Sequence, residues 1–240
     1  MGIEWIVSEE DPDISVVIPS LPEHEVQGSA ELQNQLCNSY EVLIVRDGSL
    51  DICEARNAGI EAASAEYIAL TDDDTRPPYE WVSTALDRLR EGAALIEGPI
   101  LKVYDERGDT EFRESYRRYV GCNLAFREDV WVAVGGFDSQ FAGWADDTVF
   151  GWEVENQFGL DQCRYDRGFC MYHIGDMRSP LDQEIDNRMR RTYPERYFSL
   201  HRSPSNIKGQ IATVMLHACH MLSPRIADEL SRVIWELTWD

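Results

Sequence analysis

The stretch Tyr67-Ile68-Ala69-Leu70-Thr71-Asp72-Asp73-Asp74 joins a short apolar run to three consecutive acids. The apolar run is typical of a buried strand in a parallel sheet, and the acids follow its carboxyl end. Adjacent carboxylates repel one another, but they become favourable when a hard divalent cation such as Mg²⁺ or Mn²⁺ binds their oxygens. The stretch therefore predicts a metal that binds a phosphorylated substrate at the end of a strand.

Strand and helix signals alternate around this stretch. Ile14–Ile18 and Glu41–Arg46 are predicted as further buried strands, and residues 51–63 as a helix with one apolar face. This alternation predicts an α/β fold with a mainly parallel central sheet flanked by helices. Ligands of such sheets bind outside the carboxyl ends of the strands. We therefore expect Asp47 and the acids Asp72–Asp74 to lie in one cleft.

The second half of the chain has a less regular pattern. Residues 121–126 are predicted as a short strand, residues 146–158 as a helix, and residues 163–174 as extended chain. Beyond residue 175 the composition becomes charged and helical. This shift predicts a C-terminal helical appendage over residues 179–240.

The composition excludes one class of partner and favours one environment. Among 240 residues, Lys and Arg number 22 and Asp and Glu number 44, so the formal net charge is −22. Nucleic-acid binding needs a basic footprint, so it is not expected. Acids spread along the whole chain are typical of halophile proteins, because salt screens their repulsion. An ordinary acidic cytosolic protein is the alternative.

Cysteine usage and hydropathy predict the compartment. The six cysteines form no C-x-x-C pair and no visible disulfide framework, which favours a reducing compartment. The first residues lack the pattern of a signal peptide, and no apolar run reaches the roughly 18 residues of a membrane-spanning helix. A cytoplasmic protein is expected, either free or peripheral on the cytoplasmic face of a membrane.

A set of motifs in a fixed order carries a family resemblance. Besides residues 67–74, the motifs are Ser15-Val16-Val17-Ile18-Pro19-Ser20, Val45-Arg46-Asp47-Gly48-Ser49, Ala55-Arg56-Asn57-Ala58-Gly59-Ile60, Gly121-Cys122-Asn123-Leu124-Ala125-Phe126-Arg127, Gly135-Gly136-Phe137-Asp138 and Ala145-Asp146-Asp147. Together they resemble a family 2 glycosyltransferase with the GT-A nucleotide-sugar fold, which is Rossmann-like. The resemblance implies a glycosyltransferase domain over residues 1–178, with a nucleotide-sugar half at about 12–95 and an acceptor half at about 96–178.

The resemblance assigns the nucleotide contacts. Pro19 and Ser20 match the backbone that receives the base, and Asp47 matches the acid that hydrogen-bonds it, usually uracil. A carboxylate suits an imide N–H because it only accepts hydrogen bonds; the alternative for Asp47 is a turn former before Gly48. Arg56 matches an Arg-Asn element near the nucleotide and is expected to pair with phosphate, the alternative being an exposed helix charge.

The resemblance also assigns the metal site. In the D-x-D pattern, Asp72 is expected to approach the ribose or sugar and Asp74 to bind the metal, with Asp72 as a further metal ligand. Asp73 is counted among the donor-binding residues, and its role is left open. His173 lies where many family members place a histidine that completes the site; a structural histidine is the alternative. The expected cofactor is Mn²⁺ or Mg²⁺.

The acidic pair Asp146-Asp147 is expected to supply the chemistry. Asp147 matches the general base that takes a proton from the acceptor hydroxyl, with Asp146 as the second choice, and a helix N-terminus would keep Asp147 ionised. Simple N-capping is the alternative. Trp144 either stacks on an acceptor sugar or belongs to the core.

These assignments predict an inverting, metal-dependent glycosyltransferase. It would move a sugar from a nucleotide sugar, expected to be UDP-linked, to a glycan or a polyprenyl-phosphate-linked acceptor. A nucleotidyltransferase and a catalytically degenerate sugar-binding or scaffolding relative are the alternatives. The C-terminal helices are expected to dock on the domain, contact a membrane surface, or dimerise.

Overall fold

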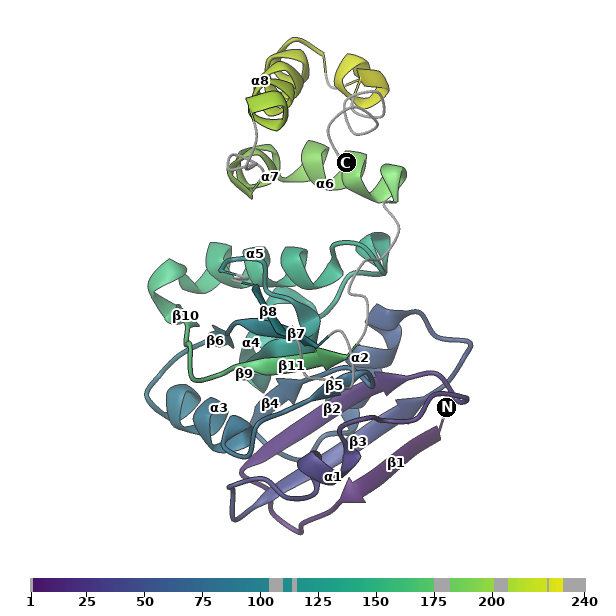
Figure 1. Cartoon of the computed structure of the whole chain (residues 1–240), viewed down its shortest axis with the longest axis vertical. Coiled ribbons are helices and arrows are strands. Elements are labelled where there is room, and N and C mark those ends of the chain that lie inside the picture. Colours follow the sequence, from purple (N-terminus) through teal and green to yellow (C-terminus); the bar gives the residue numbers. More distant parts are fainter. Residues whose placement is uncertain are drawn as a thin grey trace. The chain divides into compact units, whose positions relative to one another are not determined.

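The computed structural model describes residues 2–103, 110–113, 116–174, 182–200, 207–223 and 225–230 (Figure 1). The chain divides into two compact units, Met1–Arg178 and Ser179–Asp240, which we describe separately. The functional division into a donor half, an acceptor half and a helical extension stays a prediction.

A seven-stranded sheet organises the first unit. Its strands are β1 (Gly2–Val7), β2 (Ile14–Ser20), β3 (Tyr40–Arg46), β4 (Tyr67–Leu70), β6 (Leu95–Glu97), β9 (Leu124–Arg127) and β10 (Cys163–Tyr165), in the order β1-β3-β2-β4-β9-β6-β10. Strands β3, β2, β4, β6 and β10 run in one direction, whereas β1 and β9 run antiparallel to their neighbours. The predicted α/β fold with a mainly parallel central sheet is confirmed, although the edge strand β1 had no recognisable sequence signal.

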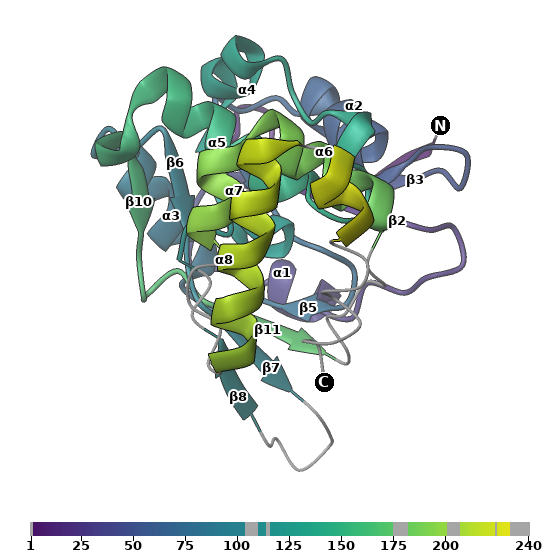
Figure 2. The ribbon, with the colours of Figure 1, turned by 90° about the horizontal axis from the view of Figure 1, so that it is seen from above.

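A second, four-stranded sheet brings His173 close to the three acids that precede β5. It contains β5 (Thr75–Arg76), β7 (Ile100–Val103), β8 (Thr110–Arg113) and β11 (Met171–Ile174), in the order β5-β11-β7-β8 (Figure 2). Strand β5 follows directly after the three acids, and His173 of β11 lies opposite Thr75. The extended chain expected over residues 163–174 is thus two strands, β10 and β11, which belong to different sheets.

Helices cover both faces of the large sheet, so the side chains of β2 are buried on both sides. The helices of this unit are α1 (Ser29–Leu32), α2 (Ile52–Ala62), α3 (Trp81–Arg90), α4 (Glu128–Val134) and α5 (Asp146–Phe158), with 3-10 turns at η1 (Gly121–Asn123), η2 (Ser139–Phe141) and η3 (Leu160–Gln162). Asp51 and Glu54 form a reciprocal capping box that fixes the start of α2. A Cβ at Gly59 of α2 would overlap the Val17 side chain, so this helix packs tightly on its face of the sheet.

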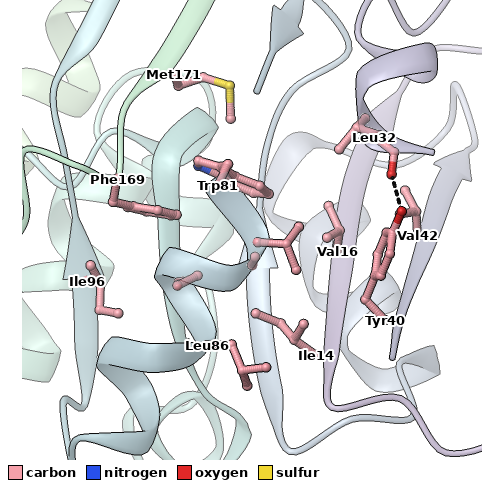
Figure 3. Close-up of a cluster of buried hydrophobic side chains, with 14 of the residues drawn as sticks. Ile14, Val16, Leu32, Tyr40, Val42, Trp81, Leu86, Ile96, Phe169 and Met171 are labelled. Atoms are coloured by element: carbon pink, nitrogen blue, oxygen red, sulfur yellow. Dashed lines mark hydrogen bonds between the residues drawn. The ribbon is translucent and has the colours of Figure 1, made fainter. Parts of the chain in front are cut away.

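The opposite face of the sheet carries the core under α3 (Figure 3). Ile14 and Val16 of β2 are fully buried there, since alternate residues of a strand point to one face. Trp81 of α3 stacks on Phe169 with 5.2 Å between ring centroids. This packing fixes the carboxyl end of β4, where the acids begin.

The described residues of the second unit are mainly helical. It contains α6 (Gln183–Thr192), α7 (Pro194–Leu200), α8 (Ile207–Leu222) and a helical segment at residues 225–230. Arg190 is fully buried and pairs with Asp228, while the Phe198 ring stacks on His217 at 4.2 Å. Among the helices that the structure describes, none is both long enough and apolar enough to cross a bilayer.

Candidate active site

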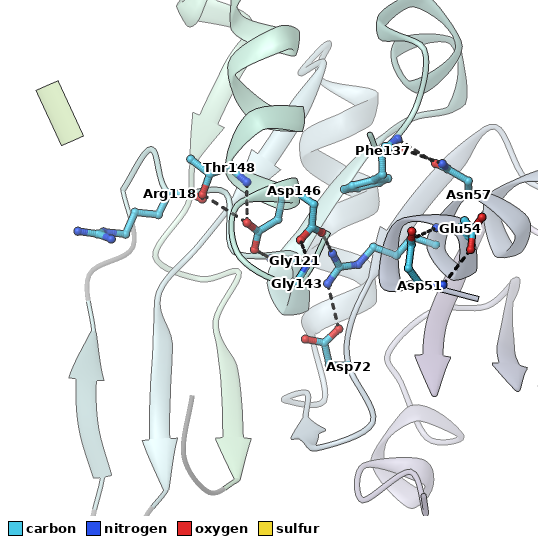
Figure 4. A network of polar contacts seen from close by, with 12 residues as sticks. Asp51, Glu54, Asn57, Asp72, Arg118, Gly121, Phe137, Gly143, Asp146 and Thr148 are labelled. Atoms are coloured by element: carbon cyan, nitrogen blue, oxygen red, sulfur yellow. Dashed lines mark hydrogen bonds and ion pairs between the residues drawn. The ribbon is translucent and has the colours of Figure 1, made fainter. Parts of the chain in front are cut away.

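Arg56 of α2 forms ion pairs with Asp72 and Asp146, which belong to the polar network in Figure 4. Its side chain is 6% exposed, donates to Asp146, and lies 3.4 Å from Asp72 Oδ1. Burial alone would lower the pKa of Arg56, but Asp146 and Asp72 raise it, so the guanidinium stays charged. Arg56 therefore bridges an acid after β4 and an acid at the start of α5. It is not the exposed helix charge considered as the alternative.

Gly121 occupies the space between this guanidinium and Asp147. A Cβ at Gly121 would overlap the Arg56 guanidinium, so only glycine fits. The Gly121 N–H donates to Asp147 Oδ2 at 2.7 Å. The sequence prediction placed Gly121 in a strand, whereas it lies in η1 and the strand β9 begins at Leu124.

The two acids at the start of α5 have different partners. Asp146 is held by Arg56 and by the Gly143 N–H at 3.0 Å. Asp147 accepts from the N–H groups of Gly121 and Thr148, and among the described residues it forms no ion pair with Arg56. This geometry favours Asp147 over Asp146 as a proton acceptor.

The environment of Asp147 also suits a base. Burial raises its pKa to about 7, the charge of Asp146 adds to this, and Arg56 opposes it. The helix N-terminus was expected to keep Asp147 ionised, but burial opposes ionisation of this carboxyl group. A carboxylate with a pKa near neutrality matches the requirement for general-base catalysis at neutral pH.

Asp74 and His173 lie side by side. Asp74 Oδ2 is 3.3 Å from His173 Nε2, while Asp74 Oδ1 and His173 Nδ1 are buried and have no hydrogen-bond partner among the described residues. Burial raises the pKa of Asp74, and His173 opposes this shift. Unpartnered oxygen and nitrogen atoms of this kind fit ligands of a divalent cation. No group of three or more His, Cys, Asp or Glu within the described ranges is arranged as a metal site.

The neighbouring acids Asp72 and Asp73 point elsewhere. Asp72 pairs with Arg56, as described above. Asp73 accepts from Ser20 Oγ at 2.7 Å and lies 3.1 Å from His24 Nδ1. Asp73 therefore ties the chain that follows β2 to the acidic run. His24, a single histidine in a loop, gave no sequence signal for this contact.

Asp47 forms the turn after β3. Its carboxylate accepts from the Ser49 hydroxyl at 2.6 Å and the Ser49 N–H at 2.9 Å, and these bonds lower its pKa to about 2. Pro19 and Ser20, at the end of β2, pair in register with Val45 and Arg46 of β3. The geometry is that of the turn former named as the alternative, and base recognition by Asp47 stays a prediction.

The family model described as Glycosyl transferase family 2 matches residues 50–145. In this segment the chain is similar to family 2 glycosyltransferases. The matched segment includes Arg56 and the acids Asp72–Asp74, and it ends directly before Asp146.

Two relatives from Haloferax volcanii are similar to part of this chain. Glucosyl-dolichyl phosphate glucuronosyltransferase is 27% identical over 118 residues, which are 41% of this chain and 38% of the relative. Glycosyltransferase AglE is 27% identical over 135 residues, which are 50% of this chain and 44% of the relative. The matches thus span less than half the length of either relative. Their organism is consistent with the halophilic origin predicted from the charge.

Two further residues lie near these elements: Trp144, which the sequence predicted as a site residue, and Arg46, which it did not. Trp144 is partly exposed in the turn before α5, where its N–H donates to the Phe141 carbonyl at 3.4 Å, so its contact with an acceptor stays a prediction. Arg46 donates to the Leu21 and His24 carbonyls at 3.2 and 2.8 Å and thereby shapes the loop after β2. Its position inside the Val45-Arg46-Asp47 motif was the signal that could have identified it.

Proposed function

We propose that the domain catalyses inverting transfer of a sugar from a UDP-sugar to a glycan or polyprenyl-phosphate-linked acceptor, with Mn²⁺ or Mg²⁺ as cofactor. The observation that carries this proposal is the bridge from Asp72 through Arg56 to Asp146, which places the candidate base Asp147 beside the acids after β4. The name of the relative that acts on glucosyl-dolichyl phosphate supports a lipid-linked acceptor.

In this proposal Asp147 is the general base. It takes the proton of the acceptor hydroxyl while that oxygen forms a bond to the anomeric carbon, and the bond from this carbon to the nucleoside diphosphate breaks. Direct displacement assisted by one base inverts the configuration at the anomeric carbon. Asp146 has a different role, because its carboxylate is already held in an ion pair with Arg56.

Asp74 and His173 would hold the metal ion, and Asp72 would lie toward the ribose or sugar. A divalent cation bound there would supply neutralisation of the negative charge on the departing diphosphate. Asp73 accepts a hydrogen bond from Ser20, the last residue of β2, where the base is expected to bind. The role of Asp73 is therefore structural support of the donor side.

Residues of the chain argue against two alternative functions. A nucleotidyltransferase would place a loop rich in Gly, Lys or Arg after the first strand of the nucleotide half, but Pro19-Ser20-Leu21-Pro22-Glu23 lacks these residues. A scaffolding relative would tolerate loss of the acids, yet Asp74, Asp146 and Asp147 are all present.

We further propose a cytoplasmic location, with peripheral membrane contact through the C-terminal helices.

The purified 240-residue chain in high salt, with Mn²⁺ or Mg²⁺ and a panel of nucleotide sugars, provides the test. We expect one donor to be bound and slowly hydrolysed, and Asp74→Ala to abolish this activity. Asp87→Ala, on the exposed side of α3, is the matched control and should behave as the wild type. Absence of metal-dependent nucleotide binding in the wild type would overturn the proposal.

A further inference from the structure

The segment Arg117–Tyr119 has an unfavourable backbone conformation. Arg117 has φ 60° and Tyr119 has φ 51°, and they are the non-glycine residues with positive φ in the part of the chain that the structure describes. Side chains with a Cβ rarely adopt this left-handed region, so it persists only where surrounding contacts impose it. The contacts that impose it here come from two buried glutamates.

Glu97 holds the backbone of the segment. It lies at the end of β6 and is 2% exposed. One carboxylate oxygen accepts from the Arg117 N–H, and the other accepts from the Tyr119 N–H at 2.9 Å. A single carboxylate thus binds the N–H groups of both left-handed residues.

Glu155 holds the side chains of the same segment. It lies on α5, two turns after Asp147, and is 5% exposed. Its two oxygens accept from Arg117 Nε at 2.8 Å and Arg117 Nη2 at 2.6 Å, and it also accepts from the Tyr119 hydroxyl. Gly151 leaves room for the Tyr119 ring, which a Cβ at this position would overlap.

The clamped segment leads directly to the candidate base. The Thr148 hydroxyl donates to the Arg118 carbonyl at 2.7 Å, and two residues after Tyr119 the Gly121 N–H donates to Asp147 (Figure 4). The position of this N–H is therefore set by how the segment before it is held.

We propose that Glu97 and Glu155 are positioning residues that hold residues 117–119 in their left-handed conformation and so fix the Gly121 N–H against Asp147. The effect on catalysis rests on the proposed function, whereas the effect on Asp147 itself does not. Because the Gly121 N–H lowers the pKa of Asp147, loosening the segment should make Asp147 ionise less readily.

The test is titration of the Asp147 carboxyl by NMR with ¹³C-labelled aspartate, assigned through Asp147→Asn. In Glu97→Gln the amide has one acceptor oxygen for two N–H groups. We expect the titration midpoint to rise by about one pH unit, and transfer to fall roughly tenfold at pH 6.5 but little at pH 9, with the KM for the donor unchanged.

Tyr119→Phe removes the hydroxyl bonds to Glu155 and Cys163 but leaves the Glu97 carboxylate in place, so it is the milder variant if Glu97→Gln does not fold. It should shift the midpoint in the same direction by less and speed hydrogen exchange at the Gly121 amide. Glu153→Gln neutralises a glutamate on the same helix that forms no hydrogen bond or ion pair through its side chain with the described residues, so it is the matched control and should change neither quantity.

A midpoint and an exchange rate equal to the wild type in folded Tyr119→Phe would overturn the clamp. The carboxyl titration does not depend on turnover, so a protein without transferase activity would reject the proposed function and leave this result readable. Normal transfer together with an unshifted midpoint would reject the clamp alone.

Discussion

At the scale of single residues, the buried ion pairs of Arg56 join separate elements of the fold. It is one buried guanidinium with two carboxylate partners on different elements, Asp72 and Asp146. Breaking a buried ion pair by removing one member is more damaging than losing a surface pair, because the remaining charge stays buried without compensation.

We predict that Arg56→Gln lowers the free energy of unfolding by about 3 kcal/mol. Asp146 would lose its partner, and the pKa of Asp147 would rise above its present value of about 7 because Arg56 now lowers it. Urea unfolding measures the first effect. Arg164→Gln, which breaks the surface pair with Glu91, should cost less than about 1 kcal/mol. Equal losses in both variants would contradict the central role of Arg56.

The pKa of Asp147 predicts the pH dependence of transfer. The base must be ionised, so kcat/KM should rise about tenfold per pH unit below pH 7 and level off above it. Initial rates at constant salt measure the profile. Asp147→Asn should keep donor binding and lose transfer, and a variant that transfers normally would show that another group is the base.

At the scale of elements, sequence patterns predicted which strands and helices form better than they predicted directions of side chains. The strand before Asp72 and the capped helix α2 follow from apolar periodicity and a capping box. The three acids after β4 were expected to act together, but consecutive side chains leave a turn in different directions. Asp72 reaches Arg56, Asp73 reaches Ser20, and Asp74 reaches His173.

The clamp on residues 117–119 had no sequence signal. Glu97 follows a short apolar run, Glu155 lies in a mixed polar and apolar helix, and neither belongs to a quoted motif, so only the fold brings them to one segment. The second sheet was equally hidden, because β5 has only two residues and a single pairing decides its place. Long-range pairing of this kind is set by tertiary packing rather than by local propensity.

We predict that Gly151→Ala destabilises the protein by about 1–3 kcal/mol, although alanine favours a helix, because the new Cβ would overlap the Tyr119 ring. Thermal or urea unfolding measures the loss. Combining it with Tyr119→Ala removes the overlap, so the two losses should be less than additive. Strict additivity would argue against contact between these positions.

At the scale of the whole molecule, the large negative net charge sets how stability depends on salt. A formal net charge of −22 on 240 residues implies strong self-repulsion in dilute salt. Exposed acids are screened as the Debye length falls from about 10 Å at 0.1 M salt to about 3 Å at 1 M. The buried network around Arg56 is screened much less.

We therefore predict that the melting temperature rises between 0.1 M and 1 M KCl, because the salt screens the repulsion between exposed acids. Differential scanning calorimetry measures the change, and an equal osmolality of sucrose controls for solute exclusion. A melting temperature that falls with KCl would show that surface repulsion does not limit stability. The Arg56→Gln variant should retain the same salt response, because its lost pair is buried.

The antiparallel strand β9 has a consequence for how the chain reaches its native state. Residues 67–70 and 95–97 both pair with residues 124–127, so β4 and β6 are joined only through a later segment of the chain. Until that segment emerges during synthesis, the edge of β4 lacks its partner and can bind another chain. Fragments that end before residue 124 should therefore aggregate, whereas fragments that include β9 can close the sheet.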